Sequence, residues 1–293
     1  MKLRYILIFI LAFALIPMLQ LGNAIAYEKN PRHSFALSYE KNPRPSVQSV
    51  SSAFLSSSPN HALEDTNHLL IVLDPAHGYD VSGKRSPETN KRNGDIDTSL
   101  LFYEYQFSRK IIDNLEPLLD SVGIYHILSN PYDYEIGLRS RVNNTNAYAK
   151  LWRKSPEKLF PDSVKSDYFI NIKKSSQISR ITFFLSLHNN ASGNGINWMK
   201  ARGFSAWTSR HVSRSDLAAD IFLDEFESEF PDIKITGHRE SNFAVLMCKP
   251  YAVLIECLFQ DNKLDVLTLN DPDFQIRYTY VLLRSIIRFN NTL

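Results

Sequence analysis

Short apolar runs alternate along this chain with longer segments in which apolar and polar residues are mixed. From residue 67 onward the apolar runs are rich in Val, Ile, Leu and Phe and are bounded by Pro, Gly or Asn, which is typical of buried strands. The pattern predicts strands at 69–74, 124–129, 180–188 and 204–209, and a closing pair at 244–248 and 252–257.

The segments between these runs carry apolar residues at every third or fourth position, which predicts helices. The helices expected are 98–123, 136–152, 215–230 and 271–289, the last with Asp271 as N-cap and Pro272 at its first position. Strands that alternate with helices indicate an α/β fold. We therefore predict a three-layer α/β/α sandwich, with a mostly parallel, twisted sheet between two layers of helices.

The first 66 residues follow a different pattern. Lys2 and Arg4 precede an apolar run at 5–21, and Ala24-Ile25-Ala26 has the small-x-small form of a cleavage site. This predicts a signal peptide over 1–26 and export to the periplasm or the exterior. An uncleaved membrane anchor is the alternative, because the run approaches the ~17-residue lower limit for a span. If residues 1–26 are removed, the mature chain has no stable membrane span.

Residues 27–66 are interpreted as a low-complexity linker, and residues 67–293 as the domain that carries the function. The linker contains a duplicated twelve-residue segment, 27–38 and 39–50, followed by a Ser-rich stretch. Within the domain, the polar segment 153–180 reads as an inserted loop with a short strand at 168–172. One hypothesis is that this insertion covers a functional site as a lid. The alternative is that it is a surface loop without a functional role.

Composition limits the class of protein further. The 293 residues are 44% hydrophobic and carry a formal net charge of +2, which does not indicate a nucleic-acid-binding protein. Two cysteines, Cys248 and Cys257, do not make a disulfide framework. Because they would lie at opposite ends of a strand, we predict two free, buried thiols.

Three of the predicted strands end on a side chain that can bind metal or move a proton: His77, His188 and Glu256. Ligands of open α/β sheets bind at the carboxyl ends of the strands, so the three are expected to share one site. A carboxylate at the end of an apolar strand requires a partner. For Glu256 the candidates are proton transfer beside a metal and an ion pair with Arg239. For His77 the alternative is a turn histidine bonded to backbone.

A fourth candidate, Glu104, lies on the same helical face as the apolar Phe107, Ile111 and Leu115. An ordinary surface glutamate near a helix N-terminus is the alternative. His77, Glu104 and His188 together make a His₂Glu set, which recurs in catalytic zinc sites, and Glu256 would serve as the general base. The supporting or substrate-contacting candidates are Asp74, Asn190 and Arg239.

These segments resemble the zinc-dependent N-acetylmuramoyl-L-alanine amidases. The similar segments, in family order from about residue 68 to 290, are LLIVLDPAHG, EYQFSRKIIDNL, LRSRVNNTNAY, FFLSLHNNAS, SDLAADI and KPYAVLIECLFQDN. The resemblance implies a six-stranded sheet, one zinc ion and peptidoglycan as substrate. It also implies hydrolysis of the amide between N-acetylmuramic acid and L-alanine.

The spacing departs from the family at one point, because the span from His77 to Glu104 is longer than usual. Glu88, inside that span, is therefore a competing third ligand. Two other functions remain open. One is a zinc peptidase or carboxypeptidase that acts on wall peptides, and the other is a peptidoglycan-binding module without catalysis. The sequence does not identify an activator protein.

Overall fold

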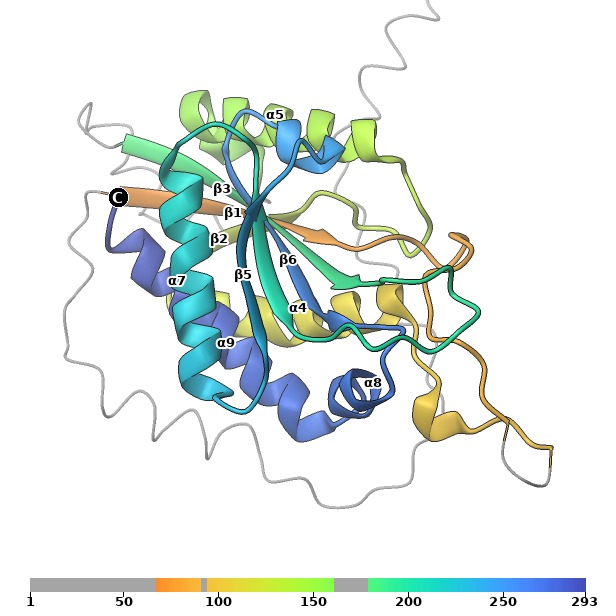
Figure 1. Cartoon of the computed structure of the whole chain (residues 1–293). Helices are drawn as coiled ribbons and strands as arrows, with labels where there is room; N and C mark the ends of the chain where they lie inside the picture. Colours follow the sequence, from red (N-terminus) through yellow and green to blue (C-terminus); the bar gives the residue numbers. More distant parts are fainter. Residues whose placement is uncertain (1–66, 91–93, 161–178) are drawn as a thin grey trace, which may run out of the picture. The chain divides into compact units, whose positions relative to one another are not determined.

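Six strands of the described residues lie side by side in one sheet in the computed structural model of the chain (Figure 1). The structure describes residues 67–90, 94–160 and 179–293, all within a compact unit that spans Ala62–Leu293. The sheet order is β2-β1-β3-β6-β4-β5. The strands are β1 (Asn67–Pro75), β2 (Tyr125–Leu128), β3 (Ser179–Asn190), β4 (Phe204–Thr208), β5 (Ile235–Glu240) and β6 (Tyr251–Phe259).

The sheet is mostly parallel, as predicted. Strands β2, β1, β3 and β6 run in the same direction, β4 is antiparallel to β6, and β5 is parallel to β4. The carboxyl ends of β1, β3 and β6 therefore meet at one edge, whereas β4 and β5 end at the opposite edge.

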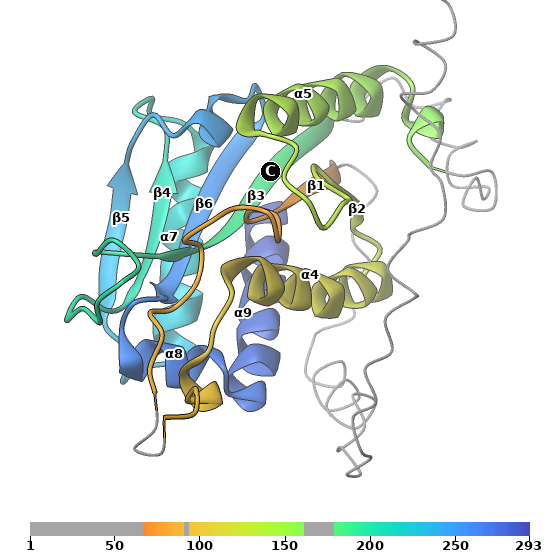
Figure 2. The same ribbon diagram turned by 90° about the vertical axis from the view of Figure 1, so that its right-hand side faces the viewer.

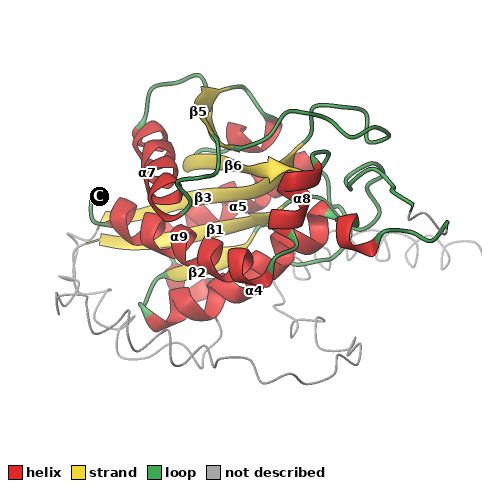
Figure 3. Ribbon diagram, turned by 60° about the horizontal axis from the view of Figure 1, so that its bottom comes forward, coloured by secondary structure: helices red, strands yellow, loops and turns green. Residues whose placement is uncertain are grey.

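Helices cover both faces of the sheet, which confirms the predicted three layers. Helices α4 (Glu104–Ser121), α7 (Arg214–Glu229) and α9 (Pro272–Asn290) lie on one face, and α5 (Leu138–Lys154) lies on the other (Figures 2 and 3). The shorter helices are η3 (Thr98–Leu100), η4 (Pro156–Lys158), η6 (Ala244–Met247) and α8 (Lys263–Leu269).

Two hydrophobic cores of unequal size hold the layers together. Leu69, Ile71 and Leu73 of β1 point into the larger core under α4, α7 and α9. Leu70 and Val72 point into the smaller core under α5. Successive side chains of a strand face opposite sides of a sheet, so a strand covered on both faces needs apolar residues throughout. That requirement explains the unbroken apolar runs.

Most of the predicted elements are confirmed, and the differences have physical causes. The predicted strand at 244–248 is wrong. This segment forms η6, whose Val245 and Leu246 pack into the smaller core. The sixth strand is instead β5 at one edge of the sheet, which is only partly buried and lacks the apolar run of the central strands. The predicted helix 98–123 is divided, because α4 begins only at Glu104. Asp271 caps α9 as predicted.

Several expectations concern residues beyond those described. The signal peptide (1–26), the linker (27–66) and the strand at 168–172 lie outside the described residues, and so does most of the insertion on which the lid hypothesis rests (161–178 of 153–180). Within the described ranges, no helix combines the length and the apolar character needed to cross a membrane. Both cysteines are free as predicted, but only Cys257 is buried, and Cys248 is partly exposed.

A buried ion pair connects α5 to the end of β1. Arg141 donates to the Asp74 carboxylate (Nη1 to Oδ1, 2.9 Å) and to the backbone carbonyl of Pro75. Asp74 is fully buried, and its two other donors are the hydroxyls of Ser129 and Ser186. The charge on Arg141 therefore neutralises a carboxylate that water cannot reach, just before the strand ends.

Replacing Arg141 should destabilise the fold strongly. We expect Arg141→Met to lower the free energy of unfolding by about 3–5 kcal/mol, because the Asp74 carboxylate would remain buried without a counter-charge. The double variant Asp74→Asn/Arg141→Met should recover part of the loss. Urea denaturation measures both. The control is Arg288→Met, which removes surface ion pairs with Asp224 and Glu225 and should cost below about 1 kcal/mol. If Arg141→Met and Arg288→Met lower the free energy of unfolding equally, the buried pair of Arg141 and Asp74 does not stabilise the fold as described.

Candidate functional site

The registers of three parallel strands bring the predicted strand ends together. Pro75 of β1 pairs with Leu187 of β3, which precedes His188 by one residue. His188 in turn pairs directly with Glu256 of β6. His77, two residues beyond the end of β1, consequently lies beside His188. The site predicted from the sequence is thus assembled at one edge of the sheet.

His77, Glu104 and His188 form a close group. The carboxylate of Glu104 lies between the two imidazoles, with His188 Nδ1 3.0 Å from Oε1 and His77 Nε2 3.6 Å from Oε2. The two rings are nearly perpendicular, with centroids 5.0 Å apart. One nitrogen or oxygen from each of the three side chains lies within 4.8 Å of the other two. Such a group could hold a single metal ion.

Helix α4 places Glu104 in this group because the helix begins at that residue. Its backbone N–H bonds to the carbonyl of Lys84, which ties the helix start to the long loop after His77. The Glu104 side chain is fully buried and faces the sheet, like the later residues of the same stripe, Phe107, Ile111 and Leu115. It is therefore not an ordinary surface glutamate.

Glu88, the competing ligand, lies elsewhere. Its side chain is 57% exposed and pairs with Arg85, three residues away in the sequence. It is not a member of the histidine and glutamate group. The geometry therefore favours Glu104 as the third ligand.

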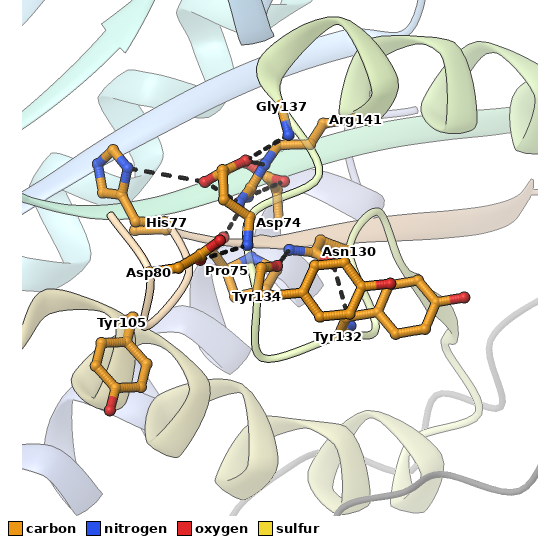
Figure 4. A network of polar contacts seen from close by, with 12 residues as sticks. Asp74, Pro75, His77, Asp80, Tyr105, Asn130, Tyr132, Tyr134, Gly137 and Arg141 are labelled. Carbon is orange, nitrogen blue, oxygen red and sulfur yellow. Dashed lines mark hydrogen bonds and ion pairs between the residues drawn. The ribbon is translucent and has the colours of Figure 1, made fainter. Parts of the chain in front are cut away.

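The loop that carries His77 is held from several directions (Figure 4). His77 has a φ of 45°, an unusual value for a residue other than glycine. Arg109 of α4 donates to the carbonyls of Ala76 (3.1 Å) and His77 (2.8 Å). Gly78 contacts the neighbouring loop so closely that a Cβ there would lie 2.2 Å from the backbone nitrogen of Glu135. These contacts fix the backbone from which the imidazole projects.

Three buried polar atoms of the candidate site have no hydrogen-bond partner. His77 Nε2, Glu104 Oε2 and Glu256 Oε2 are buried and accept or donate no hydrogen bond. Leaving a polar atom buried and unpaired costs free energy unless a ligand or water satisfies it. Two imidazoles and a carboxylate are ligands that zinc prefers. The residues present therefore fit a zinc ion, and the Glu256 oxygen is the one of the three atoms that lies outside this ligand set.

The protonation states suit this interpretation. Burial lowers the pKa of His77 to about 4, so its ring is neutral near neutral pH and offers a lone pair. Burial alone would raise the pKa of Glu104, but the hydrogen bond with His188 lowers it overall. Burial alone would lower the pKa of His188, whereas the Glu104 bond raises it. A metal ion bound by both side chains would take the place of the hydrogen bond between Glu104 and His188.

Glu256 has the properties of a proton-transfer group. It lies on the strand next to His188, with its side chain largely enclosed, and burial raises its pKa to about 7. No ion pair joins it to Arg239 within the described part of the chain. Strands β4 and β6 are antiparallel, so Arg239 lies beside Trp207 at the level of Leu254, further back along β6. There the exposed Arg239 guanidinium covers the Trp207 ring at 5.6 Å.

The supporting residues differ from those expected. The side-chain oxygen of Asn190 accepts a hydrogen bond from the adjacent Ala191 N–H, whereas the backbone N–H of its neighbour Asn189 donates to Glu104 Oε1 (3.0 Å). Asp74 binds Arg141, which also donates to the carbonyl of Pro75 at the start of the His77 loop. Periodicity carried no signal for the role of Arg109, since its partners Ala76 and His77 are distant along the chain.

Comparison with known proteins supports the resemblance seen in the sequence. The family model for N-acetylmuramoyl-L-alanine amidase (Amidase_3) matches residues 71–288. No curated protein matches the sequence of this chain significantly.

Solved structures of amidases share the fold. The N-acetylmuramoyl-L-alanine amidase of Clostridium difficile 630 superposes with a TM-score of 0.55 and 20% identity, covering 77% of this chain and 98% of that one. The catalytic domain of CwlV from Bacillus (Paenibacillus) polymyxa var. colistinus has a TM-score of 0.51 and 20% identity, covering 76% and 98%. The CwlD amidase of Clostridioides difficile, solved in complex with the GerS lipoprotein, has a TM-score of 0.51 and 18% identity, covering 76% and 99%.

These structures share the fold with this chain at low identity, and the family model supplies the assignment. Its match begins within β1 and ends near the end of α9, and so includes the ends of β1, β3 and β6 as well as the start of α4. Because the match extends over most of the sequence, this chain belongs to the N-acetylmuramoyl-L-alanine amidase family of enzymes.

Proposed function

We propose that this chain is an exported, zinc-dependent amidase that hydrolyses the bond between N-acetylmuramic acid and L-alanine in peptidoglycan. Family membership supports the reaction class. Zinc dependence is supported mainly by the group of His77, Glu104 and His188, in which buried ligand atoms lack partners. Export is supported by the signal-peptide pattern of residues 1–26.

In this proposal His77, Glu104 and His188 hold one zinc ion. When bound, zinc would polarise the scissile carbonyl and acidify a water molecule. Glu256 supplies the proton transfer: its carboxylate takes the proton of the attacking water as the C–O bond forms. It then passes that proton to the L-alanine nitrogen as the C–N bond breaks. The products are the muramic acid carboxylate and a free stem peptide.

Each protein group has a matching role in the mechanism. The neutral His77 offers a lone pair, the ionised Glu104 balances the charge of the metal, and the enclosure of Glu256 keeps its basicity high. Among the structural relatives, CwlD is solved together with a lipoprotein, so an amidase of this fold can bind a partner protein.

The function is tested by mass spectrometry of muropeptides after digestion of purified peptidoglycan. We expect intact stem peptides that begin with L-alanine, and loss of this product when a chelator removes zinc. Restoring zinc should restore the product. Cleavage within the stem peptide would indicate a wall peptidase instead. Binding to peptidoglycan without any cleavage would indicate a binding module.

Glu256→Gln should abolish most of the activity but leave zinc bound. The amide keeps the size of the side chain and cannot act as a base, so kcat should fall by roughly 10²- to 10⁴-fold. Zinc content, measured by atomic emission, should stay near one ion per chain. The control Glu240→Gln alters an exposed carboxylate at the end of β5 and should leave kcat unchanged. An active Glu256→Gln variant would contradict the assignment of Glu256.

The raised pKa of Glu256 also predicts how the stability of the metal-free protein depends on pH. The folded-state pKa of about 7 exceeds the ordinary value of 4.5, so the folded state retains its proton after the unfolded state has lost it. The stability of the wild type relative to Glu256→Gln should therefore be greatest below pH 4.5. It should fall as the pH rises to about 7, by about 3 kcal/mol in total.

Denaturation of both proteins in chelator across this pH range measures the difference. The Glu240→Gln variant serves again as the control, and its curve should stay parallel to that of the wild type. If the wild-type and Glu256→Gln curves are also parallel, the Glu256 carboxyl does not titrate near pH 7 in the folded protein.

A further inference from the structure

The second ring nitrogen of His77 faces a carboxylate that the proposed reaction does not use. Nε2 of His77 points toward Glu104, with 3.6 Å between the nitrogen and Oε2. Nδ1, on the other side of the ring, is 4.0 Å from Oε2 of Glu135 (Figure 4). The imidazole therefore stands between the carboxylate of the candidate metal site and a second carboxylate behind it.

The position of the Glu135 carboxylate is determined by the buried Arg141. The guanidinium donates two parallel hydrogen bonds, Nε to Oε1 (3.1 Å) and Nη2 to Oε2 (2.9 Å). The backbone N–H of Gly137 adds a third bond to Oε1 at 2.8 Å. Since Arg141 is itself held by Asp74 and Pro75, the carboxylate is connected to the end of β1. Two parallel hydrogen bonds from one guanidinium fix the orientation of the carboxylate and also balance its charge.

This arrangement leaves Oε2 of Glu135 able to accept a further hydrogen bond. Oε1 of Glu135 already accepts two hydrogen bonds, whereas Oε2 accepts one, from Arg141. The free lone pairs of Oε2 thus lie on the side of the His77 ring. A shift of about 1 Å would bring Oε2 and Nδ1 to the normal hydrogen-bond distance.

We propose that Glu135 is a positioning residue for the metal ligand His77. Its carboxylate accepts the Nδ1–H of His77, which fixes the tautomer whose Nε2 lone pair points to the metal and holds the plane of the ring. Carboxylates that accept the second N–H of a ligand histidine orient the ring and increase its basicity. This role deepens the proposed function and rests on it, because it requires a metal at His77.

The test measures zinc affinity rather than activity. We expect Glu135→Gln to bind zinc roughly 10- to 100-fold more weakly than the wild type in competition with a fluorescent chelator. The amide can still accept a bond from Arg141 through its oxygen, but its NH₂ group would then face the Nδ1–H of His77. In nitrogen-proton correlation spectra of the zinc-loaded protein, the Nδ1–H signal of His77 should move upfield in the variant.

The matched control is Asp133→Asn in the same loop. Asp133 is 59% exposed and pairs with Arg109, so its replacement removes a nearby charge without facing His77. It should leave zinc affinity within about twofold of the wild type, since exposed charges interact weakly. If Glu135→Gln does not fold, Glu135→Asp keeps the charge beside Arg141 but shortens the reach, and it should bind zinc at least several-fold more weakly.

The outcomes separate this proposal from the proposed function. A wild type that binds no zinc would overturn the metal site and the role of Glu135 together. If the wild type and the Glu135 variants bind zinc equally, only the role of Glu135 is overturned. A lower unfolding free energy of the metal-free Glu135→Gln protein, with unchanged zinc affinity, would likewise overturn it, since Glu135 would then serve only as a structural partner of Arg141.

Discussion

Parallel pairing of β1 with β3, and of β3 with β6, places His77, His188 and Glu256 at one edge of the sheet. The pairing registers are held by apolar side chains on both faces, which pack into two separate cores. A shift of one residue along β3 would turn every side chain of that strand to the opposite face. It would point His188 away from Glu104 and bury polar residues in a core. The geometry of the site is thus maintained by hydrophobic packing along the whole length of the strands.

Asp74 and Glu104 are two of the fully buried carboxylates near this edge, and they are stabilised in different ways. Asp74 is neutralised by Arg141 and has a hydrogen-bond donor on each of its two oxygens. Glu104 receives one imidazole and one backbone N–H and keeps an oxygen without a partner. The first carboxylate therefore belongs to the scaffold. The second has the incomplete coordination expected of a ligand.

Local sequence patterns predicted most of the strands and helices and the central residues of the candidate site. Buried parallel strands need apolar residues on both faces, so their ends, and with them His77, His188 and Glu256, were recognisable. Glu104 was recognisable as an acid on an apolar helical stripe. The edge strand β5 was missed because one partly exposed strand has no distinctive pattern, and η6 was mistaken for a strand because short apolar runs are ambiguous.

The supporting contacts depend on long-range geometry that periodicity does not record. The segments that resemble the family include Arg109 and Arg141, but periodicity gives neither of them a role, and only the fold brings them and Glu135 to the His77 loop. Gly78 has a related consequence, because it lets this loop and the Glu135 loop touch backbone to backbone. Any side chain at position 78 would push the loops apart. In the course of evolution the two loops should therefore change together, and exchanging one loop between family members without the other should be poorly tolerated.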